Sequence, residues 1–147
     1  MRLIVFRGKS LKDGSWVYGD LEYSRSKEQA LIHSYTSDGI YNGQQLVDID
    51  TVGQFTGMQD KNGKAIYEGD IVCRHETPFE INDVGEVVYN EAIGAFRIHL
   101  EKHGFSSRLS FISSETYNDG YCTVDCKYDY EVLGNVFDNS ELLINNE

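Results

Sequence analysis

The side chains best suited to chemistry in this chain are its three cysteines and four histidines. Cys73 and His75 alternate along a predicted strand, so both side chains lie on one face, as a nucleophile with its base or two metal ligands would. Two further pairs are spaced four residues apart: Cys122 with Cys126, and His99 with His103. On a strand this spacing separates two side chains by about 13 Å, too far to share one ion whose ligands lie at about 2 Å. Cys73 and His75 could join a distant third ligand, but an ordinary core cysteine and a surface histidine are favoured, so no metal site is expected.

Close pairs of carboxylates are the second possible source of chemistry. Glu68 and Asp70 alternate as residues on one strand face do, but they stand beside a turn rather than in a cleft. Asp60 and Asn62 match the first two ligand positions of a calcium loop, whereas Lys64 stands where the third oxygen ligand belongs, so a hairpin turn is predicted instead. The sequence contains neither the Gly-x-Ser-x-Gly nucleophile elbow of serine hydrolases nor a phosphate-binding glycine loop. We expect no catalytic, cofactor-binding or metal-binding residues, and a protein that is not an enzyme.

The charge of the chain narrows the class of its partners. Its 147 residues include 13 basic and 24 acidic side chains, for a net charge of −11. Nucleic-acid binding gains affinity from lysine and arginine that neutralise phosphates, so a general nucleic-acid binder is disfavoured, as is an anionic membrane surface. An acidic surface that binds a basic protein stays open.

Cysteine usage and the start of the chain indicate a reducing compartment. Three cysteines cannot all pair within one chain, and residues 1–7 hold too few apolar residues for the core of a signal peptide. We expect three free thiols and a cytoplasmic protein.

Short apolar runs between glycine turns predict an all-β, mainly antiparallel protein. The predicted strands are 3–6, 15–18 with an extension over 20–23, 30–35, 46–49, 65–67, 71–73, 85–89, 95–100, 108–112 and 130–133. Turns are predicted at Lys12-Asp-Gly14, Asn42-Gly43 and Asn62-Gly63. A short helical turn is predicted over Glu141–Leu143. We expect an N-terminal β-unit of residues 1–50 beside a second domain of residues 51–147.

One continuous block carries a recognisable signature: Thr-Val-Gly-Gln-Phe-Thr-Gly-Met-Gln-Asp-Lys-Asn-Gly-Lys-Ala-Ile-Tyr-Glu-Gly-Asp-Ile-Val over residues 51–72. Pieces that fit before and after it are Trp16-Val-Tyr-Gly-Asp-Leu21, Gly85-x-Val-x-Tyr89, Gly94-Ala-Phe96 and the run from Tyr130 to Leu143. The block closely resembles the signature of the YopX family of phage and prophage proteins. The resemblance implies a β-rich protein whose C-terminal part forms a small SH3-like barrel, encoded by a phage or prophage. It implies no biochemical activity.

We expect the signature to act through the fold. Gly69 stands where the chain bends before it re-enters the sheet, and Asp70 is placed to accept backbone N–H bonds in that turn. Trp16 is expected to pack opposite residues 3–6 in the first hairpin. The residues predicted to be structural are Trp16, Gly53, Phe55, Gly57, Asn62, Gly63, Tyr67, Gly69, Asp70, Gly134 and Asn135.

A cluster of tyrosines near the C-terminus has two interpretations. Its members are Tyr117, Tyr121, Tyr128 and Tyr130. They either edge a small barrel, with the ring inward and the hydroxyl in water, or form a protein–protein interface, where tyrosine is enriched. We expect a non-catalytic phage or prophage accessory protein that binds a phage or host protein, or itself, in the bacterial cytoplasm. The alternative is a nucleic-acid-associated small barrel that stacks bases on its aromatic rings.

Overall fold

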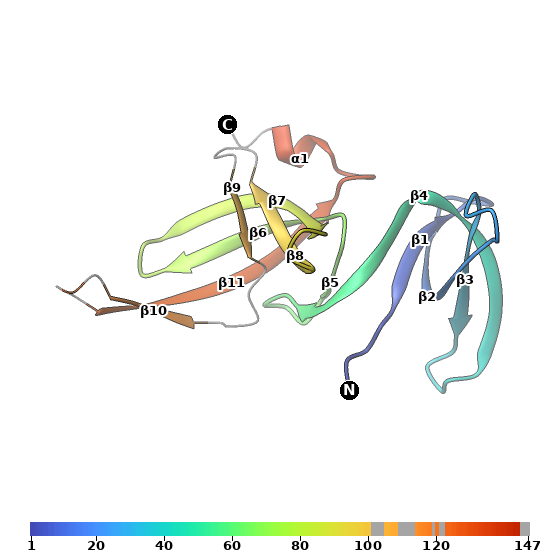
Figure 1. Ribbon diagram of the computed structural model, residues 1–147, viewed down its shortest axis with the longest axis horizontal. Coiled ribbons are helices and arrows are strands. Elements are labelled where there is room, and N and C mark those ends of the chain that lie inside the picture. The colour runs from blue at the N-terminus through green and yellow to red at the C-terminus, as the bar shows by residue number, and fades with distance from the viewer. Residues whose placement is uncertain (101–104, 109–113, 119, 121–122, 145–147) are drawn as a thin grey trace. The chain divides into compact units, whose positions relative to one another are not determined.

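The computed structural model describes residues 1–100, 105–108, 114–118, 120 and 123–144 (Figure 1). Its elements are β1 (Phe6–Ser10), β2 (Trp16–Tyr23), β3 (Ala30–Tyr35), β4 (Tyr41–Gln59), β5 (Ala65–Tyr67), β6 (Asp70–Thr77), β7 (Ile81–Asn90), β8 (Ala95–Leu100), β9 (Phe105–Arg108), β10 (Ser114–Asn118), β11 (Thr123–Asn135) and α1 (Glu141–Ile144). The strands pair antiparallel in two sheets. The prediction of an all-β, antiparallel protein with a short C-terminal helical turn is confirmed. No helix among the described residues is long and apolar enough to cross a membrane.

The chain divides into two compact units, a first unit of Met1–Gly57 and a second unit of Met58–Glu147. The boundary expected between residues 50 and 51 lies inside β4, which is one unbroken strand. Pairing with β1 continues along β4 as far as Gln54, the register partner of Phe6. Since these backbone hydrogen bonds hold residues 51–54 against β1, the first unit extends beyond the predicted boundary.

A closed ring of strand pairings builds the first unit. β1 pairs with β2, β2 with β3 and β3 with β4, and β4 returns to pair with β1. The buried side chains inside this ring are Val17, Ala30, Ile32 and Val47. Gly8 faces them, and a Cβ at this position would lie 2.9 Å from Cγ2 of Val47. Glycine therefore allows β1 to close the ring without a steric clash.

A bulge allows β1 to pair with two separate parts of β4. The register shifts between Arg7, opposite Gly53, and Lys9, opposite Asp48. Thr51 satisfies the backbone at this break, because its hydroxyl donates to the Asp48 carbonyl at 2.7 Å and accepts the N–H of Lys9 at 2.8 Å. The buried threonine thus replaces the ladder bonds that the bulge removes.

The second sheet contains six strands in the order β10-β11-β6-β7-β8-β9. The core cluster of the second unit contains Val72, Val87, Ile98, Leu100 and Tyr130 from this sheet, together with Ile66 from β5, which belongs to the five-stranded sheet. β10 and β9 stand at the two ends of this order, and in the part of the chain that the structure describes no pairing joins them. The closed ring of pairings therefore lies in the first unit, not in the region for which a barrel was expected.

Two local predictions in the first unit are wrong. The apolar run over residues 3–6 was expected to form the first strand, but β1 covers Phe6–Ser10 and leaves Leu3 and Ile4 exposed. A turn was expected at Asn42-Gly43, which instead lies inside β4. In both places tertiary pairing overrides the local signal, because Gly8 fits against the core and residues 41–47 of β4 pair with β3.

Candidate interaction surface

Gly69 and Asp70 form a buried turn between β5 and β6. Gly69 has a φ of +85°, and its N–H donates to the Val87 carbonyl at 2.8 Å while its own carbonyl accepts the N–H of Val136 at 2.9 Å. Asp70 is 2% exposed, and its Oδ2 accepts the N–H of Tyr67 at 2.8 Å. The turn therefore connects β7 and the end of β11 through hydrogen bonds to backbone groups.

Asp60 organises the hairpin turn that precedes β5. Its carboxylate accepts the N–H groups of Asn62 at 2.8 Å, Lys64 at 2.9 Å and, from β11, Val132 at 3.0 Å. Burial by itself would raise the pKa of Asp60, but these three hydrogen bonds and the nearby Lys64 charge lower it overall. Gly63, with a φ of +80°, completes the turn. The Asp60 oxygens therefore accept backbone N–H groups in a hairpin turn, as predicted from the sequence.

Gly134 and Asn135 sit where β11 leads toward α1. A Cβ on Gly134 would overlap the side chain of Asn139. The Asn135 side-chain oxygen accepts the N–H groups of Phe137 and Asp138, each at 3.0 Å. These bonds form an Asx turn, so the pair ends the strand and directs the chain into the helical turn.

Trp16 lies against cations rather than opposite the apolar run at the N-terminus. Its register partner is Lys9. The guanidinium carbon of Arg7 lies 4.5 Å from the centroid of the indole ring, and Nζ of Lys9 lies 5.5 Å from it. Both distances fall within the range of cation–π contacts.

Three signature residues lie along β4: Gly53, Phe55 and Gly57. Gly53 pairs with Arg7 of β1, and the N–H of Phe55 donates to the carbonyl of Val5 at 2.8 Å. Gly57 has a φ of +87°, which favours glycine.

Cys73, which was considered as a nucleophile and not predicted to be one, is a buried residue of β6. Burial and the neighbouring Glu131 raise the pKa of its thiol, although Lys61 acts in the opposite direction. Glu131 is paired with Lys61 at 2.8 Å and lies 3.7 Å from Nε2 of His75. A raised pKa keeps the thiol protonated, the opposite of what activates a cysteine.

The metal pairs considered from the sequence fall partly outside the structure. His103, Cys122 and the side chain of Cys126 lie outside the described residues. Among the residues that are described, no group of three or more histidine, cysteine, aspartate or glutamate side chains is arranged to hold a metal ion.

Of the C-terminal tyrosines, two can be placed. Tyr130 is 6% exposed and belongs to the core of the second unit. Tyr128 is half-buried and packs against the same core, with the guanidinium carbon of Arg74 5.5 Å from its ring centroid. The side chain of Tyr117 and the whole of Tyr121 lie outside the described residues.

Four of the five exposed tyrosines among the described residues lie instead on the first unit. Tyr18 is 47% exposed, Tyr35 49% and Tyr41 53%. The register pairs Asp20 with His33, and Tyr35 with Tyr41. Residues directly opposite in an antiparallel pair share a face, and Val17 and Leu21 point into the core, so these side chains occupy the outer side of β2, β3 and β4. We call this surface the aromatic–carboxylate face; it consists of Tyr18, Asp20, Glu22, His33, Tyr35 and Tyr41.

Hydrogen bonds connect the face across its three strands. His33 on β3 is bonded through Nε2 to Glu22 at 2.6 Å and through Nδ1 to the hydroxyl of Tyr41 at 3.2 Å. A hydrogen bond to the Asp20 carboxylate, then partial burial and the negative charge of that carboxylate, raise the pKa of Tyr35. The phenol therefore stays neutral and donates its proton.

The rings of Tyr35 and Tyr41 meet edge to face, with centroids 5.7 Å apart and planes at 64°. This is a favoured aromatic geometry. Together with the hydrogen bonds, it holds the exposed rings in one arrangement before any partner arrives.

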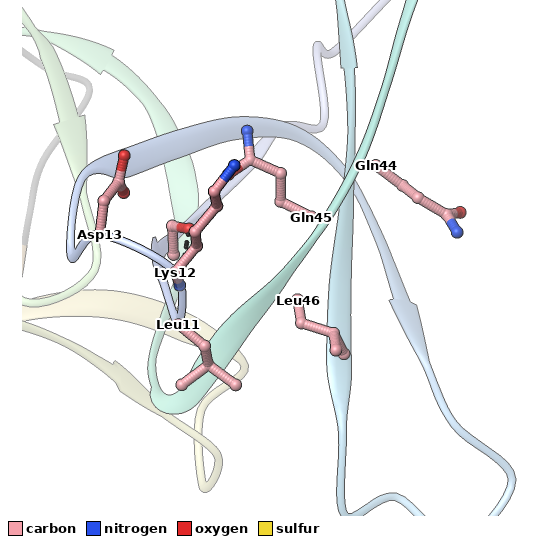
Figure 2. A pocket seen from close by; sticks show the side chains of 7 residues that line it. Leu11, Lys12, Asp13, Gln44, Gln45 and Leu46 are labelled. Atoms are coloured by element: carbon pink, nitrogen blue, oxygen red, sulfur yellow. Dashed lines mark hydrogen bonds between the residues drawn. The ribbon is translucent and has the colours of Figure 1, made fainter.

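A hollow of about 660 Å³ lies where the turn after β1 approaches β4. Figure 2 shows its lining, contributed by Ser10–Asp13 and Gln44–Leu46. Gln44 and Leu46 point to the outer side of β4, since they pair with His33 and Leu31. The Asp13 carboxylate is held by hydrogen bonds from the hydroxyl and N–H of Ser15, which lower its pKa. The hollow thus adjoins the outer surface of β4 at Gln44 and Leu46, whereas Gln45 pairs with Ile32 and points to the opposite side of the strand.

Sequence reasoning missed this face, although a signal was present. Along β2, Tyr18, Asp20 and Glu22 alternate with the inward residues Val17 and Leu21. Such alternation identifies a strand with one solvent-facing side. Which strands stand next to it, however, depends on the register.

The comparison with known protein families agrees with the resemblance noted in the sequence. The family described as YopX protein matches residues 5–144, nearly the whole chain. No curated protein matches the chain.

Proposed function

The chain belongs to the YopX family, and we propose that it is a non-catalytic accessory protein of a phage or prophage. It acts in the cytoplasm of the bacterial host by binding another protein or a second copy of itself. The observation that carries this proposal is the aromatic–carboxylate face.

Tyrosine supplies a large, rigid contact area at low entropic cost, which is why it is enriched at protein interfaces. Three tyrosines on this face are about half exposed, and two of them are already held by neighbouring side chains. An ordered surface loses less conformational freedom on binding than a mobile one.

The alternative role is a nucleic-acid-associated module. Exposed tyrosine rings support it, because bases stack on aromatic side chains. Asp20 and Glu22 stand among these rings and would repel the phosphates. Nucleic-acid binding of this kind should weaken steeply as salt rises.

The family resemblance also supports a finer description of the second unit. We infer that its strands curl as in an SH3-like barrel. Consistent with this, the six-stranded antiparallel order buries a single cluster of apolar side chains.

Photo-crosslinking in the host cell tests the proposal. A benzoylphenylalanine placed at Tyr41 should give crosslinked protein adducts, or crosslinked dimers, on irradiation. The matched control is the same amino acid at Tyr89, a 46% exposed tyrosine on β7 of the second unit. Adducts at residue 89 and none at residue 41 would contradict the proposal.

A further inference from the structure

On the strands that carry the aromatic–carboxylate face, all the aspartate, glutamate, lysine and arginine side chains are acidic. β2, β3 and β4 contain carboxylates at Asp20, Glu22, Asp48 and Asp50, but no lysine or arginine. The basic residues of the first unit lie outside these strands, at Arg2, Arg7, Lys9, Lys12, Arg25 and Lys27. By register, Arg7 of β1 lies opposite Tyr18 at one edge of the face, so aromatic rings and negative charge occur together at its other end, among Asp20, Glu22, Tyr35 and Tyr41.

The same unit already shows how an aromatic side chain holds cations. The Trp16 ring contacts both Arg7 and Lys9, with the guanidinium carbon at 4.5 Å from its centroid. Tyr35 and Tyr41 offer comparable rings that are about half exposed. Asp20 is the register partner of His33, two residues before Tyr35 on β3, so a carboxylate stands on the same face as this ring.

We propose that the aromatic–carboxylate face binds arginine side chains from an unstructured basic segment of a partner protein. This inference rests on the proposed function and adds the chemistry of the partner. A guanidinium group stacks flat on an aromatic ring and bonds a carboxylate through two N–H groups at once, so it uses both components of the face.

Charge argues against the other occupants. Two copies of the face brought together would place Asp20 and Glu22 of one copy near those of the other, and like charges repel. A nucleic acid would bring phosphates against the same carboxylates. A basic peptide alone is complementary to both the rings and the charges.

The test measures fluorescence anisotropy of a labelled peptide of alternating glycine and arginine at physiological salt. Wild-type protein should bind the peptide, and a Tyr35→Ala/Tyr41→Ala variant should bind it roughly ten-fold more weakly. Asp20→Asn/Glu22→Gln should weaken binding by about three- to ten-fold. Tyr41→Phe keeps the ring and should retain nearly full affinity, which separates loss of the face from misfolding.

Tyr89→Ala is the matched control, because Tyr89 is equally exposed on the second unit. It should bind the peptide as wild type does. Equal affinity of Tyr35→Ala/Tyr41→Ala and Tyr89→Ala would show only a general attraction to the acidic chain and would overturn the inference, as would no binding to wild type.

Two further measurements test whether the face binds something other than an arginine-rich peptide. Sedimentation equilibrium that shows a wild-type dimer lost in Tyr35→Ala/Tyr41→Ala assigns the face to self-association. A single-stranded oligothymidine that binds wild type but not this variant assigns it to nucleic acid. Either result overturns the inference. Crosslinks to a partner at residue 41 without peptide binding reject only the arginine chemistry, whereas failure of both experiments rejects the proposed function as well.

Discussion

The two units differ in where most of their described tyrosines lie. In the first unit Tyr18, Tyr35 and Tyr41 stand on the outer side of the strands, each about half exposed. In the second unit Tyr67 and Tyr130 are buried. Tyr89 of the second unit is also exposed, at 46%, so the difference is that tyrosine builds a core only in the second unit, among the described residues.

The charges of the two units differ as well. Residues 1–57 carry six basic and seven acidic side chains, whereas residues 58–147 carry seven and seventeen. Two acids of the second unit, Asp60 and Asp70, are buried and accept backbone N–H groups. Part of its negative charge is therefore structural.

The difference shows that a specific motif need not mark a site of interaction. The 51–72 block supplies turns and buried hydrogen bonds, mainly in the second unit. The exposed, hydrogen-bonded aromatic residues lie on strands of the first unit, which carries less of the signature. The residues of this block are therefore specific to the family because the turns and buried hydrogen bonds of the fold require them.

The largest effect is expected for Tyr130→Ala. Truncation of this buried ring leaves a cavity beside Ile66 and Val72, and should lower the free energy of unfolding by about 3–5 kcal/mol. Urea unfolding followed by circular dichroism measures the loss. A change below about 1 kcal/mol would place Tyr130 at a surface and remove the contrast between the units.

Asp70→Ala should follow, with a loss of about 1–3 kcal/mol. The substitution leaves the N–H of Tyr67 without its carboxylate acceptor in a buried turn. The matched control is Glu91→Ala, which removes an exposed carboxylate of the same unit and should change stability by less than about 0.5 kcal/mol. A neutral or stabilising Asp70→Ala would mean that the signature is a ligand site after all.

Local sequence patterns predicted a strand correctly where an apolar run and the turn signals on either side of it indicate the same bounds. The predicted 30–35, 65–67 and 95–100 match β3, β5 and β8 in both bounds. The predicted position of β1 was wrong because its residues, Phe-Arg-Gly-Lys-Ser, include only one large apolar side chain. The position of the strand depends instead on Gly8, which allows the ring of strand pairings to close. That requirement arises only from contacts distant in the sequence.

The candidate surface was predictable only in part, for the same reason. The turn roles of Gly69 and Asp70 follow from neighbouring residues, and the structure places both in a buried turn. Tyr35 and Tyr41 meet only because β3 and β4 pair in one register. Local signals along the chain contain no information on this register, so the interface was predicted at the tyrosines near the C-terminus instead.

Asp60→Asn should cost about 1–2 kcal/mol at neutral pH, because a charged acceptor of three N–H groups is replaced by a neutral one. The pKa of Asp60 is lowered in the folded protein, so its stabilisation is complete above the unfolded value of about 3.9 and is lost as pH falls through the folded pKa. Urea midpoints at several pH values between 7 and 3 should therefore converge for wild type and variant. A difference that stays constant with pH would show that ionisation of Asp60 contributes nothing.

The smallest effect is expected for Tyr41→Ala, at about 0.5–1 kcal/mol. The exposed ring loses its edge-to-face contact with Tyr35 and its hydrogen bond to His33, and cross-strand pairs of this kind are worth little in stability. The single tryptophan, Trp16, lies in the first unit, so its fluorescence during urea unfolding reports on this unit directly. A loss as large as that of Tyr130→Ala would make Tyr41 a structural residue. A small loss combined with weakened peptide binding would instead assign the ring to recognition, as the contrast between the units requires.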